Sequence, residues 1–138
     1  MEKNNIYKVS AFTTDIMSEP VLNDVIDSND SQLLYGEEVE VLKTHENFVY
    51  GRSEIDNYEG YILKSSLSPK RLPATHFIDC LLTHAYPRPS FKSKPYTPLS
   101  FLSRIHVASD NIRDGFIEIE NGSWIFHRHI RPLSQLIE

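Results

Sequence analysis

An internal repeat constrains the fold of this 138-residue chain more than any other feature of its sequence. Residues 78–83 match residues 9–14 at an offset of 69, and residues 124–125 match residues 61–62 at an offset of 63. Further matches lie between these two pairs of segments and follow the same order in both copies. The offset changes only in segments rich in turn formers. We therefore predict a tandem duplication of a unit of about 65 residues.

Alternation of apolar and polar residues indicates what each copy folds into. In the first copy, Val39 and Val41 alternate with charged residues, and a polar loop precedes the stretch at residues 58–62. A period of two is typical of half-buried strands, and Gly60 would let the backbone bend or approach another strand closely. Short strands between turns, without a helical period, predict a small and strongly bent β-barrel.

The predicted architecture is therefore all-β, with two tandem small barrels at residues 6–69 and 74–135. We expect a strand over residues 9–14 and a strand or short helical turn over residues 21–26. A further short helical turn is expected at residues 64–67. The linker candidate at residues 70–73 is stiffened by the prolines at positions 69 and 73.

Composition restricts the classes of partner. No apolar run approaches the roughly 18 residues that a membrane span needs, and no apolar segment follows the polar start of the chain. We therefore expect no membrane partner and a cytoplasmic location, which the single cysteine, Cys80, also fits.

Charge is divided unevenly along the chain. Residues 1–69 carry 5 Lys/Arg against 13 Asp/Glu, a balance of −8, whereas residues 70–138 carry 9 against 6, a balance of +3. Opposite signs would attract the halves to each other or steer a charged partner, and two solvated surfaces of different composition are the alternative. Without a basic run, no nucleic-acid partner is expected.

The ordered motifs of both copies resemble a known family. The first copy has Leu34-Tyr35-Gly36-Glu37, Val39-x-Val41, Phe48-Val49, Tyr58-x-Gly60-Tyr61-Ile62 and a closing Leu67. It resembles the first bacterial SH3-type (SH3b) domain of the papain-like cell-wall peptidases of the NlpC superfamily, above all the γ-D-glutamyl-L-diamino-acid endopeptidases, in which Trp usually stands where this chain has Tyr61. The second copy, with Thr83-His84-Ala85-Tyr86-x-x-Pro89 and Asn121-Gly122-Ser123-Trp124-Ile125, resembles their second SH3-type domain.

The resemblance implies two SH3-like barrels that recognise cell-wall (peptidoglycan) peptides for a catalytic peptidase domain or chain. In those enzymes the first domain borders the catalytic cleft and helps recognise the free amino end of an L-alanyl-γ-D-glutamyl peptide. A carboxylate beside a tyrosine hydroxyl can hold an ammonium group, which makes Tyr58, Glu54, Asp56 and Glu59 the candidate ligand-binding residues. The alternative is a solvated acidic loop with Tyr58 packed on the barrel.

Catalysis is not expected of the residues present. The family nucleophile stands in an Asp-Cys-Ser-Gly context, whereas Asp79-Cys80 is followed by two leucines. The repeat places Cys80 over Ala11, inside an expected strand that offers no helix dipole to lower a thiol pKa. We predict a non-enzymatic chain without a cofactor. The alternatives are the N-terminal part of an active endopeptidase whose catalytic domain lies elsewhere, and a general protein-interaction module.

Two further groups of residues are candidates for binding. On a strand, His127 and His129 would share a face and could reach a metal ion, but no further ligand is fixed by the pattern, so no metal site is predicted. Five aromatic residues interleaved with prolines would either line a ligand groove or close the end of a barrel; they are Tyr86, Phe91, Tyr96, Phe101 and Trp124.

Overall fold

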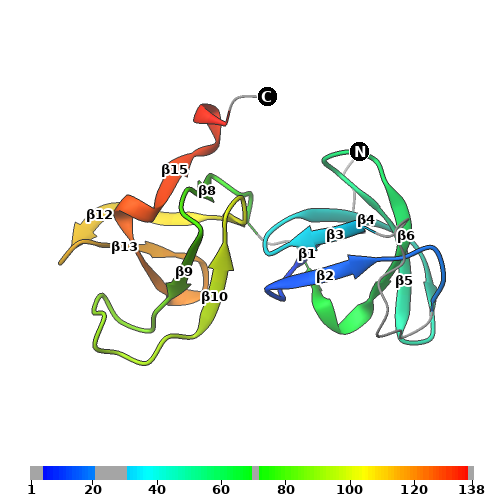
Figure 1. Cartoon of the computed structure of the whole chain (residues 1–138), viewed down its shortest axis with the longest axis horizontal. Helices are drawn as coiled ribbons and strands as arrows, with labels where there is room; N and C mark the ends of the chain where they lie inside the picture. The colour runs from blue at the N-terminus through cyan, green and yellow to red at the C-terminus, as the bar shows by residue number, and fades with distance from the viewer. Residues whose placement is uncertain (1–4, 21–30, 70–71, 137–138) are drawn as a thin grey trace. The chain divides into compact units, whose positions relative to one another are not determined.

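The computed structural model describes residues 5–20, 31–69 and 72–136 (Figure 1). Contacts divide the chain into two compact units, Met1–Lys70 and Arg71–Glu138. Regular structure in the described ranges consists of β-strands and three-residue 3-10 turns, which confirms the all-β class. None of these short turns has the length or apolarity to cross a membrane. The element expected at residues 21–26 lies outside the described residues.

The first unit is built from seven described strands and one 3-10 turn. They are β1 (Ile6–Val9), β2 (Thr13–Ile16), β3 (Ser31–Leu34), β4 (Glu38–His45), β5 (Phe48–Ser53), β6 (Glu59–Leu63), η1 (Lys64–Ser66) and β7 (Leu67–Pro69). The turn η1 confirms the helical turn predicted there.

Two antiparallel sheets form the first unit, one with the strand order β6-β5-β4-β1-β7 and one that pairs β2 with β3. A bridge between Met17 and Tyr61 joins the end of β2 to β6. The apolar residues of the alternating strands meet in a buried core made of Val9, Ile16, Leu33, Val39, Val49 and Ile62. The alternation of apolar and polar residues therefore indicates which side chains fill this core.

Gly60 is required because β2 crosses close to β6. A Cβ atom at this position would lie 2.6 Å from the carbonyl oxygen of Met17 and 2.9 Å from Cγ1 of Ile16. These distances are shorter than van der Waals contact, so only glycine allows the Met17–Tyr61 bridge to form next to it.

The second unit has eight described strands and three 3-10 turns. They are β8 (His76–Ile78), β9 (Leu82–Ala85), β10 (Thr97–Ser100), β11 (Arg104–Ile105), β12 (Val107–Arg113), β13 (Phe116–Ile119), η2 (Glu120–Gly122), β14 (Trp124–Phe126), η3 (His127–His129), β15 (Ile130–Pro132) and η4 (Leu133–Gln135).

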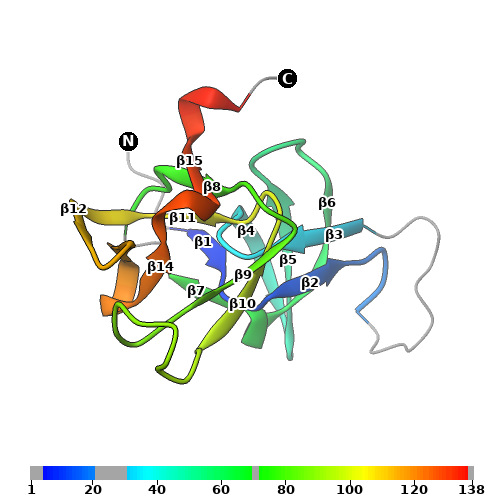
Figure 2. The ribbon, with the colours of Figure 1, turned by 60° about the vertical axis from the view of Figure 1, so that its left-hand side comes forward.

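Three antiparallel sheets form the second unit, with the orders β11-β8-β15, β12-β13-β14 and β10-β9 (Figure 2). A bridge between Tyr86 and Trp124 joins the end of β9 to β14. Strands β11 and β12 are separate because the backbone N–H of His106, which lies between them, donates to the buried Glu120 carboxylate at 2.6 Å. A side chain therefore replaces the neighbouring strand as acceptor at this point.

The two units share a pattern of pairings. The bridge residues Met17 and Tyr86 are 69 positions apart, and Tyr61 and Trp124 are 63 apart, which are the two offsets of the sequence repeat. That the units arose by duplication stays a prediction.

Two details differ from the sequence-based expectation. Residues 9–14 do not form one strand, because the chain bends at residues 10–12 between β1 and β2. The described strands also form several small sheets joined by bridges, and we find no continuous ladder that closes a barrel in the described residues.

Candidate binding site

The loop between β5 and β6 has a conformation fixed by its own hydrogen bonds. The Ser53 N–H donates to the Tyr58 carbonyl at 2.9 Å, and the Asn57 N–H donates to the Ser53 carbonyl at 2.9 Å. Oδ1 of Asp56 accepts the Tyr58 N–H at 3.1 Å. Asn57 adopts a left-handed φ of 60°, which asparagine tolerates better than most residues. The acidic loop is therefore preorganised.

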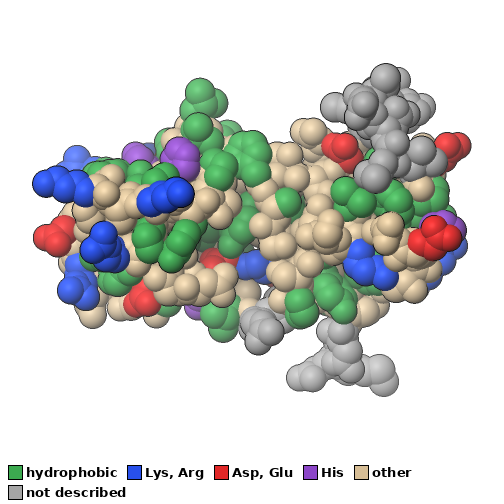
Figure 3. Space-filling model, turned by 90° about the horizontal axis from the view of Figure 1, so that it is seen from below, with side chains coloured by type: hydrophobic (Ala, Val, Ile, Leu, Met, Phe, Trp, Pro, Cys, Tyr) green, Lys and Arg blue, Asp and Glu red, His purple; other side chains and the backbone are tan. Residues whose placement is uncertain are grey.

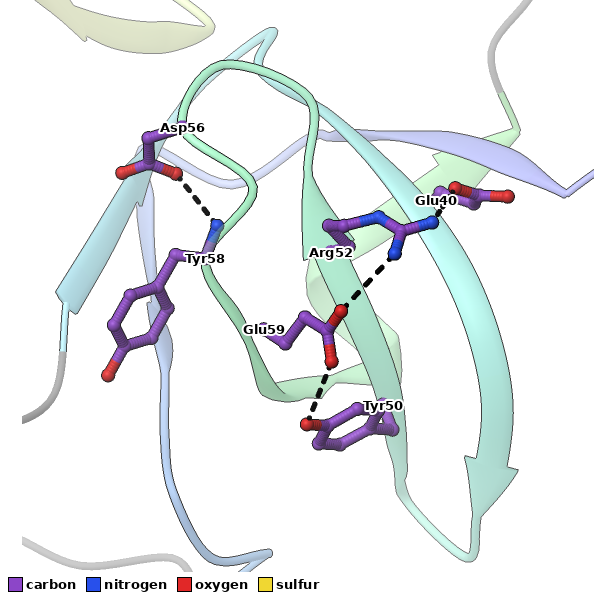
Figure 4. A network of polar contacts seen from close by, with 6 residues as sticks. All are labelled: Glu40, Tyr50, Arg52, Asp56, Tyr58 and Glu59. Carbon is purple, nitrogen blue, oxygen red and sulfur yellow. Dashed lines mark hydrogen bonds and ion pairs between the residues drawn. The ribbon is translucent and has the colours of Figure 1, made fainter.

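Three of the four predicted ligand-binding residues lie in or beside this loop. Glu54 and Asp56 are exposed, whereas Tyr58 is partly buried and packs against the core of the first unit. Figure 4 shows the carboxylate of Asp56 next to the backbone nitrogen of Tyr58, to which it is hydrogen-bonded. The loop thus presents two carboxylates on a fixed backbone beside a tyrosine anchored by its ring.

The structure separates Glu59 from this group. Glu59 begins β6 and carries its side chain on the outer face, whereas Tyr58 precedes the strand and packs against the core. One Glu59 oxygen accepts from the Tyr50 hydroxyl at 3.2 Å, and the other pairs with Arg52 at 3.2 Å. Arg52 also pairs with Glu40 at 2.6 Å (Figure 4).

This outer-face network follows from strand register. Glu40 lies opposite Arg52, and Arg52 lies opposite Glu59, so one row crosses β4, β5 and β6. The hydrogen bond that Arg52 donates to Glu40 raises the pKa of Arg52, and partial burial together with Glu59 raises the pKa of Tyr50. Cross-strand pairs of this kind stabilise a sheet. The sequence analysis did not predict this row of charged residues. The signal for it was the charged residues at alternating positions of the expected strands.

His127 and His129 are not on a strand, which corrects the expectation that they share a strand face. They form the 3-10 turn η3, and Nδ1 of His129 is 2.7 Å from Oγ1 of Thr83. Burial lowers the pKa of His129, and the nearby His127 lowers it further. No group of three metal-ligating side chains occurs in the part of the chain that the structure describes.

Cys80 is also not in a strand. It lies in the bend between β8 and β9 and is partly buried, and its thiol contacts the Leu82 carbonyl at 3.6 Å. Burial raises the pKa of the Cys80 thiol, an effect to which Asp79 adds and which the Leu82 contact opposes. Because a nucleophilic cysteine needs a lowered pKa, this thiol has the properties of a structural residue.

Aromatic rings of the second unit contact one another, but the contacting residues are not the five predicted from the sequence. The rings of Tyr86 and Phe91 contact Phe116, with centroid distances of 5.7 and 4.7 Å, and Phe91 also contacts Phe126 at 5.4 Å. Trp124 instead carries the guanidinium of Arg113 over its ring at 5.7 Å. Tyr96 and Phe101 are exposed.

Comparison with protein families gives one match. Residues 27–67 match the model of the bacterial dipeptidyl-peptidase SH3 domain. The first unit resembles a bacterial SH3 domain. The matched segment contains the whole acidic loop, and SH3-type domains of this kind are non-catalytic modules of peptidase-type proteins. No curated protein matches the chain.

Solved structures with similarity to the chain include two proteins from Trichomonas vaginalis. NlpC2 is 16% identical with a TM-score of 0.39, and the alignment covers 97% of this chain and 50% of NlpC2. NlpC1 is 16% identical with a TM-score of 0.40, and the alignment covers 95% of this chain and 46% of NlpC1. The chain therefore spans about half the length of these two proteins.

Proposed function

We propose that the chain is a non-catalytic recognition module for cell-wall peptides that carry a free amino end. The observation that supports this most directly is the acidic loop, which lies inside the segment that matches a peptidase SH3 domain and is held rigid by its own hydrogen bonds. A ligand ammonium would meet the carboxylates of Glu54 and Asp56 beside Tyr58. Charge-assisted hydrogen bonds of this type are roughly twice as strong as neutral ones.

The loop geometry gives each residue a distinct role in this proposal. Asp56 supplies charge while its Oδ1 holds the Tyr58 N–H. Tyr58 packs against the core of the first unit, and its hydroxyl would complete the site. Glu59 would act indirectly, by holding β5 and β6 in register through Arg52. The partner of the module would be a catalytic peptidase domain or chain in the cytoplasm.

Calorimetric titration with L-alanyl-γ-D-glutamyl-diamino-acid peptide tests the proposal. We expect saturable binding with a dissociation constant on the order of millimolar, since the site is open to solvent. Asp56→Asn should weaken binding because it removes the charge while keeping an oxygen for the Tyr58 N–H. Tyr58→Phe and Glu54→Gln should also weaken it.

Two matched controls sharpen this titration. Glu46→Gln removes an exposed carboxylate from the turn between β4 and β5 and should leave the affinity unchanged. Acetylation of the peptide amine removes the ligand charge and should abolish binding. Equal affinity for the acetylated peptide would refute recognition of the amino end.

A further inference from the structure

The last residue of β5, Ser53, is a polar residue at a core position. It is 1% exposed and lies opposite Val39 of β4, which is fully buried. Its hydroxyl oxygen accepts the Ile55 N–H at 3.3 Å. A serine that bonds the N–H two positions further along the chain makes a short local turn. The polar atom at this core position therefore holds the start of the acidic loop.

The backbone of Ser53 bonds to the same loop. Its N–H donates to the carbonyl that closes the loop, and its carbonyl accepts the N–H of Asn57. Ser53 thus contacts the loop through all of its polar groups, and its own position is fixed because it belongs to a paired strand. Glu54 and Asp56 stand between the residues that are bonded in this way. The side chains proposed to meet a ligand are therefore carried by backbone that Ser53 ties to the sheet.

The second unit contains the corresponding position and so provides an internal reference. Ile119 ends β13 as Ser53 ends β5, and each pairs with a valine of the preceding strand. The Ile119 N–H donates to the Ser123 carbonyl at 2.8 Å, as the Ser53 N–H donates to the Tyr58 carbonyl at 2.9 Å. Ile119 is also buried, with 2% of its surface exposed. The two residues therefore occupy equivalent core positions.

The two loops differ in what they display. The second unit has isoleucine at the shared position, and its next residue, Glu120, is buried and accepts the His106 N–H at 2.6 Å. In the first unit the next residue, Glu54, is exposed. Figure 3 shows a group of basic side chains on the surface of the second unit, which presents positive charge to solvent there.

A buried hydroxyl is the less stable choice at this position, because burial favours isoleucine and disfavours a polar group. The first unit nevertheless has Ser53 where its loop displays carboxylates, whereas the second unit has Ile119 where its loop displays none. Departures from the best core residue are expected where a position serves function.

We propose that Ser53 is the positioning residue of the ligand site, whose buried hydroxyl holds the loop so that Glu54 and Asp56 meet an incoming ammonium group. This inference rests on the proposed function of the loop. Ser53 itself would not touch the ligand, since it is 1% exposed. A loop that is already ordered loses less conformational entropy when a ligand binds. Without the hydroxyl, the affinity would fall although both carboxylates remain.

Calorimetric titration of the full chain with the free-amino peptide tests this role. Ser53→Ala should weaken binding about threefold to tenfold, the effect of losing one hydrogen bond. The thermal midpoint should stay unchanged, because the second unit has an apolar residue at this position. Ser53→Thr keeps the hydroxyl and should bind like the wild type, since the fold accepts the β-branched Ile119 here. Ser103→Ala removes a fully buried hydroxyl of the second unit and is the control that should leave the affinity unchanged.

Amide hydrogen exchange separates a positioning role from a merely structural one. In Ser53→Ala, exchange at Ile55 should become faster while the amides paired between β4 and β5 keep their rates, and Ser53→Thr should restore the slow exchange at Ile55. Faster exchange throughout β5 with a lower thermal midpoint would overturn the positioning role.

The two measurements also distinguish this inference from the proposed function. Equal affinities of the wild type and Ser53→Ala would overturn the role of Ser53 and leave the recognition function standing. A wild type that binds no peptide would overturn the recognition function. Exchange at Ile55 then decides alone whether Ser53 orders the loop, and an unchanged rate in Ser53→Ala would overturn that as well.

Discussion

Gly60 is the residue at which local geometry depends most on the absence of a side chain. Gly60→Ala would bring a Cβ atom to 2.6 Å from the Met17 carbonyl oxygen, which belongs to the backbone and cannot rotate away. We expect a loss of about 1–3 kcal/mol in the free energy of unfolding, the usual cost of overpacking. Urea denaturation measures it, with Ser65→Ala on the exposed part of η1 as the control. Equal stability of the two variants would show that β2 does not cross β6 this closely.

His129 gives stability a defined dependence on pH. Its pKa is lowered in the folded state, first by burial and then by His127. The unfolded chain therefore binds the proton more readily, so this contribution is present above the unfolded pKa of about 6.5 and is lost as pH falls below it. His129→Gln should flatten the fall in thermal midpoint between neutral and mildly acidic pH.

Exposed His45 is the matched control for this pH dependence. His45→Gln should leave the slope unchanged, because it keeps the partly buried His129 ring that contacts Thr83 in the second unit. A larger flattening of the slope by His45→Gln than by His129→Gln would contradict the assignment of this pH dependence to His129. Proton NMR titration of the His129 ring follows the same ionisation directly.

At the scale of elements, the middle of the proline-rich segment between β9 and β10 packs on its unit through the ring of Phe91. Phe91 is 58% exposed but its ring lies 4.7 Å from that of the buried Phe116. Phe91→Ala should cost about 1–2 kcal/mol in the free energy of unfolding, less than for a buried phenylalanine. Tyr96→Ala, at an exposed aromatic of the same segment, should cost less than about 0.5 kcal/mol. Guanidinium denaturation compares the two, and equal losses would mean that Phe91 has no anchoring role.

Strands in which apolar and polar residues alternate could be predicted from the sequence, whereas short bends and 3-10 turns could not. Alternation around Val39 and the glycine before Tyr61 correctly indicated strands that correspond to β4 and β6. The bend at residues 10–12 and the 3-10 turn η3 are three residues long, which is too short for any hydrophobic period. This is why Cys80 and the His127–His129 pair were expected on strands.

The sequence predicted that the candidate site lies on a loop, but it did not predict in which direction each side chain points. The sequence predicts a loop over residues 53–57, and the structure fixes this loop by hydrogen bonds. Tyr58 and Glu59 separate at the start of β6, because Tyr58 packs against the core and Glu59 pairs with Arg52 on the outer face. The ion pairs that hold Glu59 depend on strand register, which requires knowing which strands are neighbours.

At the scale of the whole molecule, the chain combines an acidic segment of −8 with a basic segment of +3. The acidic segment includes the loop proposed to bind an ammonium group, and its charge would attract such a ligand from solution.

The most direct test of the recognition role is a two-dimensional amide NMR titration with the same free-amino peptide. The account predicts saturable shifts concentrated at residues 53–58, absent when the peptide amine is acetylated and strongly reduced in Asp56→Asn. Saturable shifts that leave this loop untouched and centre on another surface would contradict the account, as would the absence of any shift at several millimolar peptide.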